Sequence, residues 1–150
     1  MHPISALQSE YSLWERGIEA EVLPTIRELG IGLVPYSPLG RGFLTGVIKR
    51  ADEMPDGDWR KSNVPRFQGE NYDRNLALVE MVKEMAARKH CTPAQIALAW
   101  LLHRSPNILL IPGTSSVAHL RENLAAETLT LSPTTLAELD GISATIAAEN

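Results

Sequence analysis

A run of branched apolar residues lies near residue 110 and ends in Pro-Gly. The run is Ile108–Gly113, and after it come the hydroxyl residues Thr114–Ser116 and a segment with helical spacing at Val117, Leu120 and Leu124. This pattern predicts a strand, a loop and the first turn of a helix. Free N–H groups of a first helical turn, the positive end of the helix dipole and a nearby glycine favour an anion such as phosphate. A capped helix after a buried strand, with no ligand, is the simpler alternative.

A second loop with the same character comes earlier in the chain. Residues 31–36 form an apolar run that predicts a strand, and the segment after it contains Gly40, Gly42 and Gly46, three glycines within seven residues. Glycine at this density indicates a loop whose backbone approaches another group closely. The chain therefore has two strand-to-loop junctions at which a ligand could bind.

Further strands and helices surround these two loops. The expected elements, in order, are a strand within residues 4–13, a helix over 19–29, a strand over 31–36, helices over 76–87 and 92–102, a strand over 108–111, and helices from 117 and from 133. Pro24 is tolerable only in a first helical turn, and Gly30 is placed to end the same helix.

Two helix starts are marked by capping residues. The capping box Thr92–Gln95, with proline at the first helical position, begins a helix that is apolar on most sides. Ser132 caps the last helix, in which Leu136, Leu139 and Ile142 are expected to face inward.

This order of elements predicts an α/β fold with parallel strands. Strands alternate with helices and no hairpin signal separates them, so crossover helices are expected to join the strands. A complete (β/α)8 TIM barrel takes about 250 residues, and its phosphate site usually lies in the loops after the last two strands. We therefore predict that residues 1–150 are the C-terminal portion of one such barrel domain, with three parallel strands and flanking helices.

Residues 51–72 have a different composition. The segment is polar and rich in Asp, Arg, Asn, Pro and Gly, with Trp59 and Phe67 as its large apolar residues. It is expected to be a long surface loop held by these two anchors. A loop of this length inside a compact domain is usually a functional lid or else disordered, and the anchors together with Arg66 favour a lid.

Charge and cysteine content exclude several classes of partner. The formal net charge is −4 and no basic stripe is present, so nucleic acid is not expected as a partner. The single cysteine, Cys91, permits no intrachain disulfide and no cysteine metal cluster, which favours a cytoplasmic location and no metal site. No apolar run approaches the roughly 20 residues that span a bilayer, and no export signal is expected.

Four motifs, taken in order, resemble the aldo/keto reductase family. They are Leu7–Leu13 (LQSEYSL), Val34–Leu44 (VPYSPLGRGFL), Thr92–Trp100 (TPAQIALAW), and Ile111–Thr114 (IPGT) followed by Glu122-Asn123. Each motif is weak alone, but their joint order and spacing extend across nearly the whole chain. The resemblance is to the C-terminal half of that family's barrel, from strand six onward.

The resemblance implies a function in reducing a small-molecule carbonyl, an aldehyde or ketone, with hydride from a nicotinamide cofactor. It implies NADP, as NADPH, with NAD as the alternative. The residues that it assigns to cofactor binding are Gln8, Tyr36, Ser37, Pro38, Leu39, Gly40, Arg41, Gly42, Arg66, Gly113, Thr114, Ser115, His119, Glu122 and Asn123.

Roles within this set follow from the same resemblance. Gln8 is expected to hydrogen-bond the nicotinamide carboxamide and Tyr36 to stack on the ring. Residues 37–42 match the loop over the pyrophosphate, where small residues expose backbone N–H groups. Residues 113–115 match the segment at the adenosine phosphate, Glu122-Asn123 match the pair at the adenine, and Arg66 resembles a basic residue that closes over the cofactor.

The sequence departs from the family pattern at His119. Many relatives have Arg or Gln there, to pair with the 2′-phosphate that distinguishes NADPH from NADH. Hydroxyl groups, helix N–H groups and a histidine can bind a phosphate, but an imidazole discriminates less than a fixed positive charge.

A larger departure concerns catalysis. The family's Tyr, Lys, Asp and His tetrad comes from the first half of the barrel, and no residue of this chain lies in a matching motif, so we assign no catalytic residue. The simplest interpretation is a truncated product or a gene model begun at an internal start codon. A short nucleotide-binding or partner-binding protein, forming a homo-oligomer through open strand edges, is an alternative, as is an unrelated phosphate-binding β/α protein.

Overall fold

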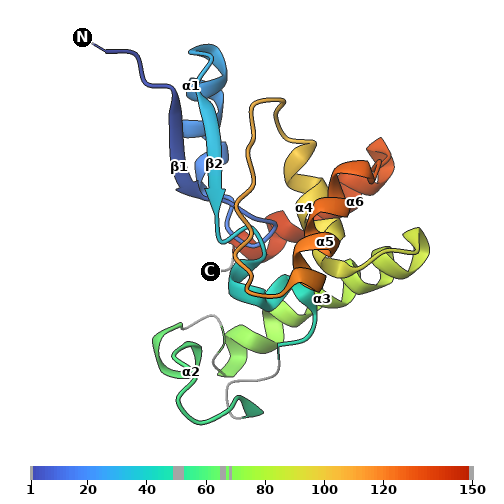
Figure 1. Cartoon of the computed structure of the whole chain (residues 1–150). Coiled ribbons are helices and arrows are strands. Elements are labelled where there is room, and N and C mark those ends of the chain that lie inside the picture. Colours follow the sequence, from blue (N-terminus) through green and yellow to red (C-terminus); the bar gives the residue numbers. More distant parts are fainter. Residues whose placement is uncertain (1, 49–52, 65–66, 68, 149–150) are drawn as a thin grey trace.

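The computed structural model describes residues 2–48, 53–64, 67 and 69–148. Figure 1 shows a pair of strands and α1 on one side of the molecule and a group of helices, α3 to α6, on the other. The elements are β1 (Ala6–Glu10), η1 (Gly17–Glu19), α1 (Val22–Glu28), β2 (Gly32–Tyr36), η2 (Gly40–Thr45), α2 (Arg60–Asn63), α3 (Gly69–Lys89), α4 (Pro93–Leu102), α5 (Val117–Ala125), η5 (Ala126–Thr128) and α6 (Pro133–Ala148).

The helices expected from the sequence are present, although the one expected over residues 19–29 is the shorter α1, preceded by η1, and the predicted caps of α4 and α6 have the expected geometry. At the start of α4 the Gln95 N–H donates to Thr92 Oγ1 at 3.3 Å, and the Thr92 N–H donates to Gln95 Oε1 at 3.0 Å. Ser132 Oγ accepts a hydrogen bond from the Thr135 N–H at 3.2 Å at the start of α6. Leu139 is buried, as predicted, whereas the Ile142 side chain lies outside the described part of the chain. No helix in that part combines the length and the apolar composition needed to cross a membrane.

Strands β1 and β2 pair in parallel, from Ala6 opposite Gly32 to Glu10 opposite Tyr36. Because side chains alternate along a strand, Leu33 faces the side covered by α1 and is 1% exposed. Gln8 and Tyr36 face the other side, where Tyr36 is 40% exposed. The strand pair therefore presents one packed face and one open face.

The strand predicted over residues 108–111 does not form, and the described sheet has two strands instead of three. Only Ile108 forms a parallel bridge, opposite Leu33: the Leu33 N–H donates to the Asn107 carbonyl at 2.8 Å, and the Leu109 N–H donates to the Leu33 carbonyl at 2.9 Å. Leu109 and Ile111 are 68% and 42% exposed. An apolar run favours an extended backbone, but a strand also needs a partner along its length, and the pairing with β2 ends after one bridge.

An aromatic cluster of Trp14, Phe43, Phe67 and Tyr72 joins the loop after β2 to α3. Phe43 stacks on Trp14 with ring centroids 4.3 Å apart, and Phe67 contacts both rings edge-on. Tyr72 contacts Phe43 edge-on, and Trp14 Nε1 donates to Asn75 Oδ1 at 2.9 Å. Phe67 is thus the buried anchor that the sequence predicts for residues 51–72.

The prediction that Trp59 is the second buried anchor of this segment is wrong, because this residue is 54% exposed. The segment also contains α2, and α3 begins at Gly69, before the predicted end of the loop. A tryptophan beside several charged residues can lie on the surface, so its size alone did not establish burial.

A charged network around Trp100 connects η1, α4 and α6. Tyr11 Oη donates to Glu19 Oε1 at 2.6 Å, and Arg104 donates to Tyr11 Oη and to Glu19 Oε1 at 3.1 Å each. Asp140 accepts from Arg104 at 3.0 Å and from Trp100 Nε1 at 2.9 Å. The Arg104 guanidinium also lies 4.9 Å from the centre of the Trp100 ring. The network thus links the chain after β1 to the C-terminal helix.

Partial burial alone would raise the pKa of Glu19, but hydrogen bonds from Arg16 and Tyr11 and the charges of Arg16 and Arg104 lower it below its ordinary value of 4.5. The unfolded chain therefore takes up a proton at Glu19 before the folded chain does. The stability that this carboxylate contributes is complete above about pH 4.5 and is lost as the pH falls below that value.

We expect Glu19→Gln to lower the free energy of unfolding at pH 7 and to make its decrease between pH 5 and pH 3 smaller than in the wild type, as judged by urea unfolding. Glu138→Gln is the matched control, because Glu138 forms a more exposed pair with Arg88 and should leave both quantities nearly unchanged. Equal acid sensitivity in all three proteins would contradict this role for Glu19.

Candidate functional site

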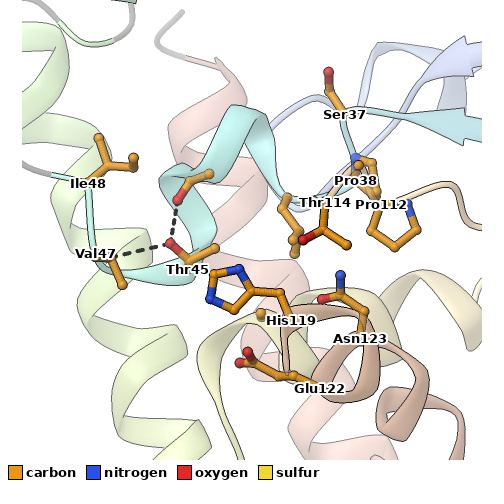
Figure 2. Close-up of a pocket in the computed structure, with 14 residues that line it drawn as sticks. Ser37, Pro38, Thr45, Val47, Ile48, Pro112, Thr114, His119, Glu122 and Asn123 are labelled. Carbon is orange, nitrogen blue, oxygen red and sulfur yellow. Dashed lines mark hydrogen bonds between the residues drawn. The ribbon is translucent and has the colours of Figure 1, made fainter. Parts of the chain in front are cut away.

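A groove of about 620 Å³ lies between the loop that follows β2 and the N-terminal part of α5. Figure 2 shows side chains from both segments pointing into it. The lining residues are Ser37, Pro38, Leu39, Gly42, Thr45, Val47, Ile48, Ala94, Pro112, Gly113, Thr114, His119, Glu122 and Asn123. The two glycine-containing loops that the sequence singles out therefore meet at one place.

The loop after β2 has an unusual backbone. Ser37, Gly40, Arg41 and Gly42 all have left-handed conformations, with φ of 52°, 57°, 55° and 94°. A Cβ atom at Gly40 would lie 2.8 Å from Cε3 of Trp14, so the backbone passes directly over the indole. The close approach that the density of glycine predicts is confirmed, and its partner is the aromatic cluster.

The opposite wall of the groove begins with the predicted helix cap. Ser116 Oγ accepts from the His119 N–H at 3.4 Å, and Thr114 Oγ1 accepts from the Ser116 N–H at 3.1 Å. A Cβ at Gly113 would meet nothing within 4 Å, so the approach to this helix end is open. The N–H groups of Val117 and Ala118, which precede the capped His119 N–H, have no carbonyl partner within the helix and can donate to an anion.

The apolar residues whose spacing predicted α5 are not buried. Val117, Leu120 and Leu124 are 65%, 46% and 63% exposed, so the helical period is confirmed while the face that carries it lies away from the described core.

Nine residues of the set assigned by resemblance line the groove together. They are Ser37, Pro38, Leu39, Gly42, Gly113, Thr114, His119, Glu122 and Asn123. The sequence analysis missed Thr45, Val47, Ile48, Ala94 and Pro112, which complete the lining. Thr45 has a local role, because its hydroxyl donates to the Gly42 carbonyl at 2.6 Å and accepts from the Val47 N–H at 3.4 Å (Figure 2). The position of Thr45 between Gly42 and Gly46 was the available signal.

The other assigned residues lie outside this lining. Gln8 and Tyr36 share the open face of the strand pair. Gly40 is buried against Trp14, and Ser115 is exposed. Arg66 lies outside the described residues.

Arg41 is not among the described lining residues of the groove. Its Nη2 lies 3.5 Å from Glu10 Oε2, while its carbonyl accepts from Arg60 Nη1 at 3.1 Å. Asp58 accepts from Arg60 at 2.6 and 2.9 Å, and these hydrogen bonds lower the pKa of Asp58 to about 2. The hydrogen bond from Arg60 to the Arg41 carbonyl therefore links residues 53–64 to the backbone of the loop after β2.

Among the lining residues that the structure describes, His119 is the basic group and Glu122 the acidic one. Backbone N–H groups, hydroxyl groups and the dipole of α5 can also attract an anion there.

The family model described as the aldo/keto reductase family matches residues 1–144. A glycerol dehydrogenase from Gluconobacter oxydans is similar in structure, with a TM-score of 0.86 and 26% identity over 96% of this chain and 43% of its own. A thermostable aldo-keto reductase in complex with the inhibitor epalrestat has a TM-score of 0.65 and 28% identity, over 91% of this chain and 39% of its own. An aldo/keto reductase from Klebsiella pneumoniae in complex with NADP and acetate has values of 0.64 and 29%, over 93% and 39%.

The contact between Gly40 and Trp14 can be tested with three alanine variants. Gly40→Ala adds a clash to a left-handed backbone and should lower the free energy of unfolding by about 2 kcal/mol or more. Gly30→Ala places the same methyl group at φ +67° with nothing nearby, and should cost about 1 kcal/mol. Gly113→Ala should change stability by less than about 0.5 kcal/mol. Equal losses at positions 40 and 30 in urea unfolding would contradict the close approach.

Proposed function

Because its residues 1–144 match the family model, this chain belongs to the aldo/keto reductase family, and we propose that it provides the part of such an enzyme that binds the reduced nicotinamide cofactor. The observation that carries the proposal is the meeting of two glycine-containing loops, far apart in the sequence, at one groove of about 620 Å³. The relative from Klebsiella pneumoniae, which was solved with NADP, supports that dinucleotide as the ligand.

The residues present fit the phosphate-bearing part of NADP. The open backbone at Gly113 and the first turn of α5 suit the adenosine phosphate. Glu122 and Asn123 lie in the same wall and offer an acceptor and an amide to the adenine. Ser37, on the opposite wall, offers a hydroxyl donor to the pyrophosphate, whereas the N–H groups of Gly40 and Gly42 already donate to the carbonyls of Ser37 and Leu39.

The strand pair suits the nicotinamide end. Tyr36 presents a partly exposed ring at the carboxyl end of β2, and Gln8 lies on the same face of β1. A flat aromatic surface and a nearby amide would fix which face of the nicotinamide ring is presented to a substrate. When bound, the cofactor supplies a hydride for a carbonyl carbon.

The activity of the whole enzyme is part of the proposal, since the chain spans 43% or less of the relatives described above. We propose that it acts on a small-molecule aldehyde or ketone and that the proton donor and its supporting residues come from the remainder of the enzyme. The role that we propose for the 150 residues is to bind and orient the cofactor.

A second candidate is a nucleotide-binding protein without chemistry, because both loops that line the groove lie within these 150 residues. The intact mass of the native polypeptide, captured with an antibody against residues 53–64, separates the two candidates. A mass near 16.5 kDa would favour the binding protein. A mass about twice that value would favour the reductase.

The proposal predicts binding without turnover by the 150-residue chain. NADPH should bind saturably, detected by the change in its fluorescence, and sugar phosphates should not displace it. With an aldehyde added, the absorbance of NADPH should stay constant. Failure of the folded chain to bind NADPH would contradict the proposed function, and turnover would contradict the assignment of catalysis to other residues.

His119→Arg should increase the preference for NADPH over NADH. A guanidinium next to the first turn of α5 is a fixed charge that can bind a 2′-phosphate, and we expect a gain of about tenfold in the ratio of the two dissociation constants. Glu127→Gln, on the exposed η5 turn, changes the net charge by the same amount away from the groove and is the control. An unchanged ratio in His119→Arg would show that no phosphate lies beside position 119.

A further inference from the structure

Gln95 forms hydrogen bonds at two helix ends at once. Its N–H and its side-chain oxygen complete the capping box with Thr92 at the start of α4, at 3.3 and 3.0 Å. Its side-chain nitrogen donates to the main-chain carbonyl of Glu122 in α5 at 3.0 Å. One partly buried amide thus joins the start of α4 to the last turn of α5.

The carbonyl that Gln95 reaches is one that the helix does not satisfy in the regular way. Glu122 is among the last four residues of α5, whose carbonyls have no regular partner within a helix. The N–H of Ala126, four residues on, donates to the carbonyls of Asn123 and Leu124 instead. The side chain of Gln95 supplies the donor at this position.

The last turn of α5, to which Gln95 is bonded, contains two residues that line the groove. Glu122 and Asn123 point into the groove from α5, as Figure 2 shows, and Ala94, the neighbour of Gln95, lines it from α4. A shift or rotation of α5 against α4 would move both side chains relative to the opposite wall. The single hydrogen bond from Gln95 ties the two helices where such a movement would matter most.

We propose that Gln95 is a positioning residue of the nucleotide site, one that sets the orientation of α5 and hence the placement of Glu122 and Asn123 against the adenosine half of the cofactor. This inference rests on the proposed function and extends it to a residue that does not touch the groove. The amide at position 95 can act both as the acceptor in the capping box and as the donor to Glu122. A glutamate could complete the capping box equally well, but a carboxylate has no proton to donate to the Glu122 carbonyl.

Gln95→Glu is therefore a nearly isosteric test. Two probes divide the cofactor: adenosine 2′,5′-bisphosphate for the adenosine half and reduced nicotinamide mononucleotide for the other half. We expect Gln95→Glu, and also the uncharged Gln95→Met, which separates the lost donor from the added charge, to weaken the binding of adenosine 2′,5′-bisphosphate about three- to tenfold, the effect of one lost hydrogen bond. The affinity for reduced nicotinamide mononucleotide should not change.

Thr92→Ala is the matched control. It removes a hydroxyl from the same capping box and should lower Tm, yet it leaves the bond from Gln95 to Glu122 in place. Binding of adenosine 2′,5′-bisphosphate should stay within twofold of the wild type, whatever the loss of Tm.

Each other outcome has a distinct meaning. If the wild-type chain binds adenosine 2′,5′-bisphosphate and Gln95→Glu binds it equally well, the positioning role is wrong and the proposed function stands. If Gln95→Glu and Thr92→Ala weaken both probes in proportion to their losses of Tm, the role of Gln95 is structural only. If the folded wild-type chain binds neither probe, the proposed function fails and this inference fails with it.

Discussion

The stack of Phe43 on Trp14 is the contact on which the groove depends. Phe43 belongs to η2, and its ring is held between Trp14, Phe67 and Tyr72. Because the aromatic side chains bury this short helix from below, the left-handed residues 40–42 above it are held in conformations that an isolated loop would rarely adopt. A buried apolar contact thus determines the shape of a polar surface.

Local patterns were sufficient to predict most of the fold. Helical period, Pro24 and Gly30 located α1, the capping box located α4, and the Ser132 cap located α6, since each signal acts within one or two turns. The prediction of a third strand failed because the pairing of one strand with another depends on residues far away in the sequence. Residues 108–111 are as apolar as β2, but only Ile108 has a partner among the described strands. The prediction that Trp59 is buried failed for the same reason, because burial depends on which distant residues cover a side chain.

The candidate site also contains features that local patterns predicted and features that depend on tertiary contacts. Short motifs located both walls of the groove, because the glycines and the cap of α5 define their own backbone geometry. The direction of Arg41 could not be read from its motif, since it depends on Glu10 at the end of another strand. The role of Gln95 was equally hidden: the capping box was evident, but the bond to Glu122 joins residues 27 positions apart. Sequence patterns identified where the chain turns, and tertiary contacts determined which side chains meet there.

The register of the strands also has a consequence for the order of folding. Pairing of Ala6 with Gly32 closes a short loop around α1, whereas the bridge between Leu33 and Ile108 closes a loop that contains η2 and all of α2, α3 and α4. The entropy lost on closing a flexible loop rises with its length, and folding slows as contacts become more distant in sequence. We therefore expect the β1-α1-β2 unit to assemble early and the groove, whose walls come from residues 37–48 and 112–123, to form later.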